Sequence, residues 1–160
     1  MNKIFISKTE LAKKVSKLRK QNKKIVLAHG VFDVVHLGHI YYFEEAKSHG
    51  DILVVSITSD RFVNKGLNKP YFNQKDRLSF LSRLSIVDYV YCNDETNASS
   101  LITAIKPSFY AKGPDYKKKK GDEAGYLSKE LSALKKVKGE PIITSTRQFS
   151  STNIINEKLN

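Results

Sequence analysis

The chain has 160 residues, of which 40% are hydrophobic and 28% are charged, a size and composition typical of one folded domain and not of a disordered chain. No apolar stretch reaches the ~20 residues that a membrane-spanning helix needs, and the first residues lack the apolar core of a signal peptide. We therefore expect a cytoplasmic protein with no membrane partner. Its one cysteine, Cys92, cannot form an internal disulfide, which agrees with a reducing compartment.

The net formal charge of +12 predicts an anionic partner: a nucleic acid, a membrane surface or a phosphorylated metabolite. Lysines are concentrated in residues 13–24 and in the run Lys117 to Lys120. Solvated surfaces explain both segments equally well, so charge alone does not choose among these partners.

Hydrophobic periodicity predicts the first elements. Leu11 and Val15 recur at helical spacing, which indicates an amphipathic helix over residues 9–21. The apolar, β-branched run 23–28 that follows is typical of a strand buried on both faces, and Gly30 ends it.

A helical pattern then runs over residues 38–48, and we expect Gly50 to cap its C-terminus. A second apolar run follows at once over residues 51–58. Strand, helix and strand in such close succession are the sequence form of a parallel βαβ unit with a right-handed crossover.

The same alternation continues along the rest of the chain. The further predicted strands cover residues 87–92, 107–111 and 141–146, and the further predicted helices cover residues 74–84, 97–106, 122–137 and a last segment from Ser151. Five strands alternating with helices predict an α/β fold, a Rossmann-like, doubly wound, open parallel five-stranded sheet in a single domain, with an N-terminal helix in residues 1–22 and the core in residues 23–160. The one long connection, Asp60 to Asn73, has a length that is more often functional than idle.

The turn after the first buried strand, "HGVFDVVHLGH" at residues 29–39, carries the clearest site signal. Open parallel sheets bind ligands at the carboxyl ends of their strands, where the free N–H groups of a helix N-terminus attract anions. The turn fits neither the dinucleotide fingerprint GxGxxG nor the P-loop. It offers instead His36 and His39, three residues apart on one helical face, on either side of Gly38.

Three interpretations of this histidine pair are open from the residues alone. Buried core histidines need partners that a junction between loop and helix rarely provides. Zinc ligands need a third and a fourth ligand, and the chain has neither an HExxH glutamate nor a second cysteine. Hydrogen-bond donors to a phosphate fit both the position in the fold and the basic charge of the chain.

Three segments together carry a family resemblance. "GVFDVVHLGH" (30–39) resembles the GxFDxxHxGH signature of the cytidylyltransferase-like nucleotidyltransferases, "KGPDY" (112–116) resembles their G-x-D-[YW] turn, and "RQFSSTNII" (147–155) resembles their R-T-E-G-I-S-T-[ST]-x-I motif. The resemblance runs from about Lys23 to the C-terminus. Within the family, the chain is most similar to the heptose 1-phosphate adenylyltransferase domain and next to glycerol-3-phosphate cytidylyltransferase.

The sequence departs from the heptose-type pattern at three places. His29 stands where that domain has asparagine, and Pro114 replaces the second glycine of its KGGDY segment. When the SSTNI segment is aligned on the family motif, the family's arginine falls on Ser145, and Arg147 lies two residues later. The roles of His29, Arg147 and the Lys117 to Lys120 run therefore stay open.

The resemblance implies a reaction in which a phosphate oxygen of a small phosphomonoester attacks the α-phosphorus of a nucleoside triphosphate (NTP) and pyrophosphate leaves. As implied catalytic residues, His36 and His39 stabilise the α-phosphate and the leaving group, Arg77 holds the acceptor phosphate and Lys65 closes over the phosphates. Mg²⁺ is implied as a cofactor that arrives with the nucleotide, with no metal site formed by the protein itself. The residues implied at the nucleotide are Gly30, Val31, Phe32, Gly38, His39, Lys112, Gly113, Asp115, Ser151 and Thr152.

Structural roles compete with several of these assignments. Arg77 fits a salt bridge with Asp76 equally well, and Lys65 fits a solvated loop. Asp33 is more typical of a residue that braces its turn than of a base. Ser151 is also a typical cap of the last predicted helix.

Together these observations predict a nucleotidyltransferase that uses ATP or CTP and a sugar or polyol phosphate to make activated precursors of cell-envelope or capsule glycans. A heptose-type sugar 1-phosphate is the first expected acceptor, and a CTP-dependent enzyme acting on glycerol phosphate is the alternative. We expect a homodimer that binds no nucleic acid. The alternatives from other classes are a basic nucleic-acid-binding module, although no aromatic residues are interleaved with the lysine runs, and a catalytically silent scaffold, although the HxGH residues are intact.

Overall fold

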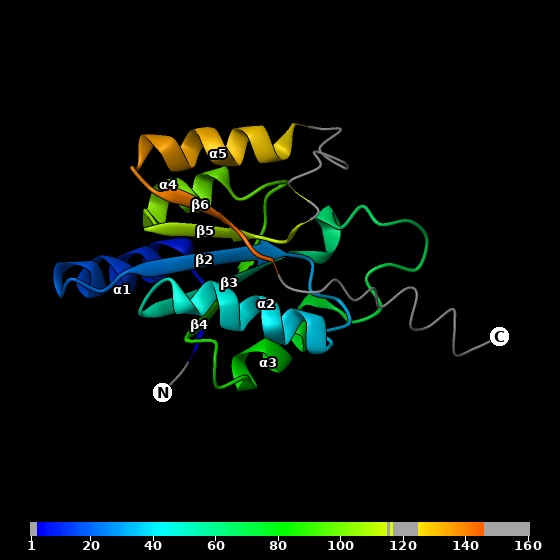
Figure 1. Cartoon of the computed structure of the whole chain (residues 1–160). Coiled ribbons are helices and arrows are strands. Elements are labelled where there is room, and N and C mark those ends of the chain that lie inside the picture. Colours follow the sequence, from blue (N-terminus) through cyan, green and yellow to red (C-terminus); the bar gives the residue numbers. More distant parts are fainter. Residues whose placement is uncertain (1–2, 115, 117–124, 146–160) are drawn as a thin grey trace.

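A parallel sheet of six strands forms the centre of the computed structural model, which describes residues 3–114, 116 and 125–145 (Figure 1). The strands are β1 (Ile4–Phe5), β2 (Ile25–Gly30), β3 (Ile52–Thr58), β4 (Tyr89–Asn93), β5 (Phe109–Lys112) and β6 (Glu140–Ile143). The helices are α1 (Lys8–Lys20), α2 (Leu37–Ser48), α3 (Gln74–Arg83), α4 (Ser99–Ile105), α5 (Tyr126–Lys136) and the short 3-10 helix η1 (Asp60–Phe62). Neighbouring strands pair in parallel in the order β1-β4-β3-β2-β5-β6.

The central strands are buried on both faces, and consecutive residues contribute to two separate hydrophobic cores. In β2, Ile25 and Leu27 pack with residues of α1, α4 and α5, whereas Val26 and Ala28 pack with residues of α2 and α3. Figure 1 shows α4 and α5 on one side of the sheet and α2 and α3 on the other. The continuously apolar sequence of β2 follows from this arrangement, because neither face of the strand meets solvent.

The predicted Rossmann-like α/β fold is confirmed, and the described sheet has one strand more than the five predicted. The additional strand β1 has only two residues, Ile4 and Phe5, which pair with Val90 and Tyr91 at the edge of the sheet. So short a strand gives neither an alternation nor an apolar run that a sequence pattern can detect.

Two predicted helices fall wholly or partly outside the described residues. The predicted helix from Ser151 and the first residues of the helix predicted over 122–137 lie outside the described residues. Within the described helices, none is both long and apolar enough to cross a membrane.

Gly50 follows α2, but it is not the left-handed cap that we expected. The C-cap residue is His49 in a right-handed conformation, and the described glycines with positive φ are Gly66 and Gly125. A Cβ atom on Gly50 would lie 2.7 Å from Cγ2 of Val26. Glycine is needed here because the chain passes close to β2 and not because of its backbone angles.

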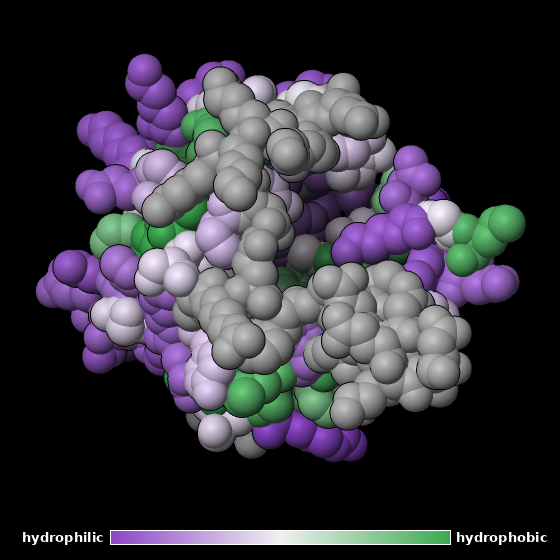
Figure 2. All heavy atoms as spheres, turned by 45° about the vertical axis from the view of Figure 1, so that its right-hand side comes forward, coloured by the Kyte–Doolittle hydropathy of each residue, from purple (hydrophilic) through white to green (hydrophobic). Residues whose placement is uncertain are grey.

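The strand order reverses beside β2, which has β3 on one side and β5 on the other. Such a switch point opens a crevice at the carboxyl ends of the strands, where open α/β sheets bind ligands. Loop 31–36 before α2 and segment 59–73 before α3 both lie at this edge, and segment 59–73 extends beyond the strand ends at the right of Figure 1. Figure 2 brings this side forward and shows hydrophilic side chains around a recess.

Candidate active site

The first turn of α2 holds His36 and His39 against each other. His36 is the N-cap residue: its Nδ1 accepts a hydrogen bond from the N–H of Gly38 at 3.2 Å, and its own N–H donates to Nδ1 of His39 at 3.3 Å. This is the reciprocal pattern of a capping box, with imidazoles in the places usually taken by serine and glutamate. The ring centroids lie 4.1 Å apart.

These hydrogen bonds assign the protons of the two rings. A ring nitrogen that accepts a hydrogen bond carries no proton, so the neutral form of each ring has its proton on Nε2. Burial lowers the pKa of His36, and burial together with the charges of His36 and Lys65 lowers the pKa of His39 to about 4. At neutral pH both rings are therefore uncharged hydrogen-bond donors at a helix end whose free N–H groups favour anions.

Phe32 supports this pair from the preceding loop. Its backbone is left-handed, with φ of 49°, and its ring packs edge-on against His39 with the centroids 5.6 Å apart. A Cβ atom on Gly30 would lie 3.1 Å from Cζ of Phe32. Gly30 is therefore required for packing at this point, because it leaves room for the aromatic ring beside His39.

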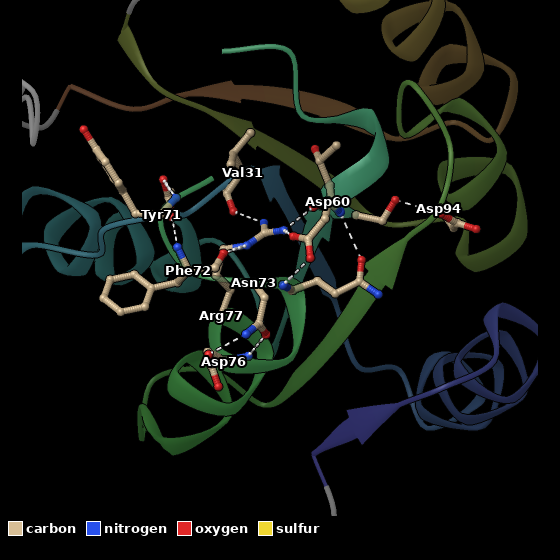
Figure 3. A network of polar contacts seen from close by, with 12 residues as sticks. Val31, Asp60, Tyr71, Phe72, Asn73, Asp76, Arg77 and Asp94 are labelled. Carbon is tan, nitrogen blue, oxygen red and sulfur yellow. Dashed lines mark hydrogen bonds and ion pairs between the residues drawn. The ribbon is translucent and has the colours of Figure 1, made fainter. Parts of the chain in front are cut away.

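Arg77, at the start of α3, is buried and bonded on every side (Figure 3). Nε donates to the carbonyl oxygen of Phe72 at 3.0 Å, and Nη1 donates to that of Val31 at 2.6 Å. Nη2 donates to the carbonyl oxygen of Thr58 at 2.9 Å and to the carboxylate of Asp60 at 2.7 Å. Arg77 thereby ties the ends of β2 and β3 to the segment that precedes α3.

The partners of Arg77 differ from the two predicted roles. Its carboxylate partner is Asp60 and not Asp76, which accepts a hydrogen bond from the side chain of Asn73. Four of the five guanidinium hydrogens are used by protein acceptors, and the side chain has no exposed surface. This arrangement makes Arg77 an anchor of the loops around the crevice and gives no support to a direct contact with the acceptor phosphate.

Asp33 connects the loop before α2 to the segment before α3. Its carboxylate accepts hydrogen bonds from the N–H of Tyr71 at 2.7 Å and from the N–H of Phe72 at 2.8 Å. The sequence predicts that Asp33 stabilises its own turn, but its carboxylate binds the opposite loop instead. Segment 59–73 is thus fixed at both ends, by Asp60 and by Asp33.

Segment 59–73 brings Lys65 close to the histidine pair. Lys65 is near enough to lower the pKa of His39. Partial burial lowers the pKa of Lys65. The charge of Asp33 raises this pKa, and the charge of Lys69 lowers it. Lys69 places its Nζ 3.4 Å from the centroid of the Tyr71 ring. The segment therefore carries two lysines to the side of the crevice where anions are favoured.

The β5 side of the crevice contains a buried ion pair. Lys112 ends β5, and its Nζ lies 3.3 Å from Oε2 of Glu130 on α5, with both side chains more than nine-tenths buried. Glu130 also accepts hydrogen bonds from the hydroxyl of Tyr110 and from the N–H of Ala98, both at 2.9 Å. The pair carries no net charge, although its two members are ionic.

His29 lies beside this pair, one residue before the end of β2. Its Nδ1 is 3.2 Å from Oγ of Ser56 on β3, and its carbonyl oxygen is 3.5 Å from Nζ of Lys112. Burial, and next the charge of Lys112, lowers the pKa of His29 to about 4. The position that departs from the heptose-type pattern is therefore an uncharged, buried part of the crevice.

The structure brings most of the described site predictions to one edge of the sheet. Around the α2 half lie Gly30, Val31, Phe32, Gly38, His36, His39 and Lys65, and at the end of β5 lie Lys112 and Gly113. The described residues include no group of three or more histidine, cysteine, aspartate or glutamate side chains placed to hold a metal ion. The predictions outside the described residues are Asp115, Ser151, Thr152, Arg147 and the Lys117 to Lys120 run.

Sequence reasoning missed two carboxylates of this site. Glu130 falls on the buried face of α5 with Leu127 and Leu134, so a charged residue at an apolar helical position is the signal that could have found it. Asp60 carries no such signal, because its partner Arg77 is distant in the sequence and lies on another element.

Residues 27–157 match the family model described as Cytidylyltransferase-like. The chain is 38% identical over 154 residues to the Bifunctional protein HldE of Aliarcobacter butzleri (strain RM4018), covering 94% of this chain and 31% of that protein. It is 37% identical over 147 residues to the Bifunctional protein HldE of Helicobacter pylori (strain J99), covering 91% and 30%. The chain thus spans about a third of the length of these curated relatives.

A solved structure is similar over most of the chain. The crystal structure of the lipopolysaccharide core biosynthesis protein from Thermoplasma volcanium GSS1 shares 32% identity with a TM-score of 0.65, and the match covers 79% of this chain and 99% of that one. The similarity therefore extends to the arrangement of helices and strands that forms the crevice.

Proposed function

This chain belongs to the cytidylyltransferase-like family and is a nucleotidyltransferase, and from that premise we propose that it transfers the nucleotidyl group of ATP or CTP to a heptose-type sugar 1-phosphate. Pyrophosphate is the second product, and the activated sugar serves the synthesis of cell-envelope glycans. Support comes from the three heptose-type motifs in the sequence and from the similarity to a lipopolysaccharide core biosynthesis protein.

The observation that carries the proposal is the reciprocal cap formed by His36 and His39. Both Nδ1 atoms accept hydrogen bonds from backbone N–H groups, so the proton of each neutral ring lies on Nε2, beside the N-terminus of α2. Donors fixed before the substrate arrives stabilise developing negative charge without reorganisation. Phosphoryl chemistry depends on this kind of positioning and charge stabilisation more than on covalent help.

In the proposed reaction a phosphate oxygen of the acceptor attacks the α-phosphorus of the NTP. A new P–O bond forms as the bond from the α-phosphorus to the oxygen bridging to the β-phosphorus breaks, and pyrophosphate leaves with that electron pair. His36 and His39 donate hydrogen bonds to the α-phosphate and to the leaving group. Lys65 and Lys69 reduce the repulsion between two anionic substrates.

Mg²⁺ would arrive bound to the triphosphate oxygens, as it commonly does in phosphoryl transfer. The two loop carboxylates agree with an ion that arrives on the nucleotide, because both already have protein partners. Asp33 accepts from two backbone N–H groups, and Asp60 is paired with Arg77. The ion would supply charge neutralisation at the phosphates. Arg77 and Asp33 act as positioning residues that hold the loops carrying the donors.

The second candidate is a CTP-dependent enzyme that acts on glycerol phosphate or a similar small phosphomonoester. The description of the matching family favours CTP, whereas the heptose-type motifs favour ATP. Both candidates use the same histidine pair, so the choice of nucleotide and acceptor separates them.

Pyrophosphate release tests the proposal directly. We would incubate the protein with Mg²⁺, each of the four NTPs and either a heptose 1-phosphate or glycerol 3-phosphate. We expect release with ATP and the heptose phosphate. Release only with CTP and glycerol phosphate would favour the second candidate, and no release with any pair would refute both.

Substitution of His39 assigns the activity to the described site. Removing one prearranged donor to a developing oxyanion typically costs about 10²- to 10³-fold in kcat, and we expect a loss of that size for His39→Ala. His49→Ala is the matched control, because His49 lies exposed at the opposite end of the same helix. Equal activity of the two variants would contradict the proposed role of the histidine pair.

A further inference from the structure

Exposed cations gather at the edge of the sheet opposite the crevice. Helices α1, α4 and α5 pack on one face of the sheet and run back along it, so their C-termini lie where β2, β5 and β6 begin. Figure 1 shows the ends of α1 and α5 on the left, at the opposite end of the molecule from segment 59–73. The exposed cations at these three helix ends and in the connections that follow, which we call the basic edge, are Lys17, Arg19, Lys20, Lys23, Lys24, Lys106, Lys135, Lys136 and Lys138.

Backbone hydrogen bonds bring the three groups of cations together. The N–H of Ser108 donates to the carbonyl oxygen of Ile25, and the N–H of Glu140 donates to that of Ser108, both at 2.9 Å. Each of these three residues follows a lysine of the basic edge by one or two positions. The cations that precede three neighbouring strands therefore belong to one continuous surface.

Few carboxylates balance the charge of this surface. Near the crevice edge, lysines such as Lys8 and Lys112 lie beside a glutamate. At the basic edge, the ion pair that the described residues form is Lys23 with Asp51, whose atoms are 3.7 Å apart. Glu140 is also exposed there. Most of the cations of the basic edge thus keep their charge uncompensated in solution.

Helix dipoles explain only part of this charge. Cations in the last turn of a helix offset the negative end of its dipole, and Lys20 and Lys135 have that position. Lys23, Lys24 and Lys138 lie beyond the helices, in the connections to the next strands. The dipole effect falls off within the last turn, so stabilisation of the helices does not account for these three lysines.

We propose that the basic edge binds the anionic headgroups of a lipid bilayer, reversibly and without insertion of the chain. This inference goes beyond the proposed function and does not depend on it. Each lysine close to an anionic membrane surface strengthens binding about fivefold, so several lysines on one surface act together. None of the exposed large apolar side chains of the described residues belongs to the basic edge, which makes the attraction electrostatic. The expectation of no membrane partner rested on the lack of a spanning segment, which surface binding does not require.

The residue types and their arrangement favour a lipid surface over a nucleic acid. Proteins bind single strands with aromatic rings that stack on the bases, and no exposed aromatic side chain among the described residues lies at the basic edge. Reading a duplex groove commonly uses arginine on a helix or ribbon that enters the groove. The basic edge has one arginine, Arg19, and its cations lie on three helix ends side by side. Lysine, a compact point charge, suits a diffuse anionic surface.

The position of the basic edge leaves the crevice free. The crevice lies at the carboxyl ends of the strands, and the basic edge lies at the amino ends of the same sheet. A protein that binds a membrane by its basic edge therefore turns the crevice toward the solution. Pyrophosphate release should accordingly stay within about twofold when anionic vesicles are added, whereas lysines of the crevice held against lipid would lower it.

Sedimentation of the full chain with vesicles tests the inference. The vesicles contain phosphatidylcholine alone or with about one-third phosphatidylglycerol, and we expect binding only to the second kind. Raising NaCl from about 0.05 M to about 0.5 M should release the protein, because salt screens the attraction.

Two double variants locate the binding surface. Lys20→Gln with Lys135→Gln removes two charges from the basic edge and should weaken binding to the anionic vesicles roughly tenfold to thirtyfold. Lys75→Gln with Lys129→Gln is the matched control, because it removes two exposed lysines near the starts of α3 and α5, at the opposite edge. We expect the control to bind within about twofold of the wild type, and thermal unfolding checks that both double variants are folded.

Several results would overturn the inference. The first is no binding of the wild type to anionic vesicles at low salt. The second is equal binding by the two double variants, which would assign any attraction to the net charge of the chain or to other lysines. The third is tighter binding to a mixed-sequence RNA duplex than to vesicles of equal phosphate concentration, weakened by the same basic-edge substitutions, which would assign the surface to a nucleic acid.

Discussion

Arg77 and Lys65, two cations that the sequence assigns to the same chemistry, are held in opposite ways. Arg77 is wholly buried and donates to four acceptors, which lie in loop 31–36, in β3 and in segment 59–73. Lys65 is exposed on segment 59–73, and its charge lowers the pKa of His39. A charged side chain whose hydrogen-bond donors are used by protein acceptors stabilises the site. A charged side chain whose donors are not used in this way can bind a ligand. The difference lies in their hydrogen-bond partners and not in their residue type.

Arg77→Ala should give the largest effect on stability. It leaves Asp60 without its cation and removes the donors of three carbonyl groups. We expect the free energy of unfolding to fall by about 3 kcal/mol, the low end of the range for broken buried pairs, because Asp60 keeps some contact with water. Urea denaturation measures this, with Arg83→Ala on the exposed side of α3 as the control. A stable variant with a specific loss of kcat would restore Arg77 as a catalytic residue.

Lys65→Ala should show the opposite behaviour. Its side chain is exposed, so we expect the free energy of unfolding to stay within about 0.5 kcal/mol of the wild type. Loss of a cation beside the anionic substrates should lower kcat/KM about tenfold to a hundredfold. Lys75→Ala, an exposed lysine on α3, is the control. A stability loss as large as that of Arg77→Ala would remove the contrast between the two cations.

Asp33→Asn should fall between these two variants. The amide that replaces the carboxylate has one acceptor oxygen and one NH2 group, so one of the N–H groups of Tyr71 and Phe72 loses its acceptor, and a loss of about 1 kcal/mol is typical of such a change. We expect a few-fold decrease in kcat/KM, because Lys65 is then held less firmly. Hydrogen exchange of the Tyr71 and Phe72 amides should become faster, while exchange in β3 stays the same. Unchanged exchange of these two amides would show that the carboxylate does not hold the segment.

Mild acid should have the smallest effect. His29 and His39 have pKa values of about 4 in the folded protein, below the ordinary histidine pKa of 6.5, so the unfolded chain binds more protons between these limits. Stability therefore falls as the pH decreases from about 6.5 toward 4, by roughly 1 kcal/mol or less per histidine between pH 7 and 6. Denaturation at several pH values measures the slope, which should decrease in His29→Asn. An identical slope in that variant would exclude His29 as a source.

The general architecture was predictable from local patterns, because β2 and β3 are continuous apolar runs and the segment between them has the length of a βαβ crossover. The two-residue strand β1 was not, since its existence depends on pairing with β4, which is distant in the sequence. The histidine pair was found because its two members are three residues apart. The partners of Arg77 and Lys112 could not be found in this way, because Asp60 and Glu130 approach them only after the sheet has formed.

The mutual cap of His36 and His39 has a consequence for how the two positions tolerate change. Each ring holds part of the backbone that orients the other, so loss of one imidazole also loosens its neighbour. The effects of His36→Ala and His39→Ala on activity should therefore be strongly non-additive, with the double variant little worse than the poorer single one. Substitution of either histidine alone therefore impairs the site, and any evolutionary replacement of both has to pass through an impaired single variant.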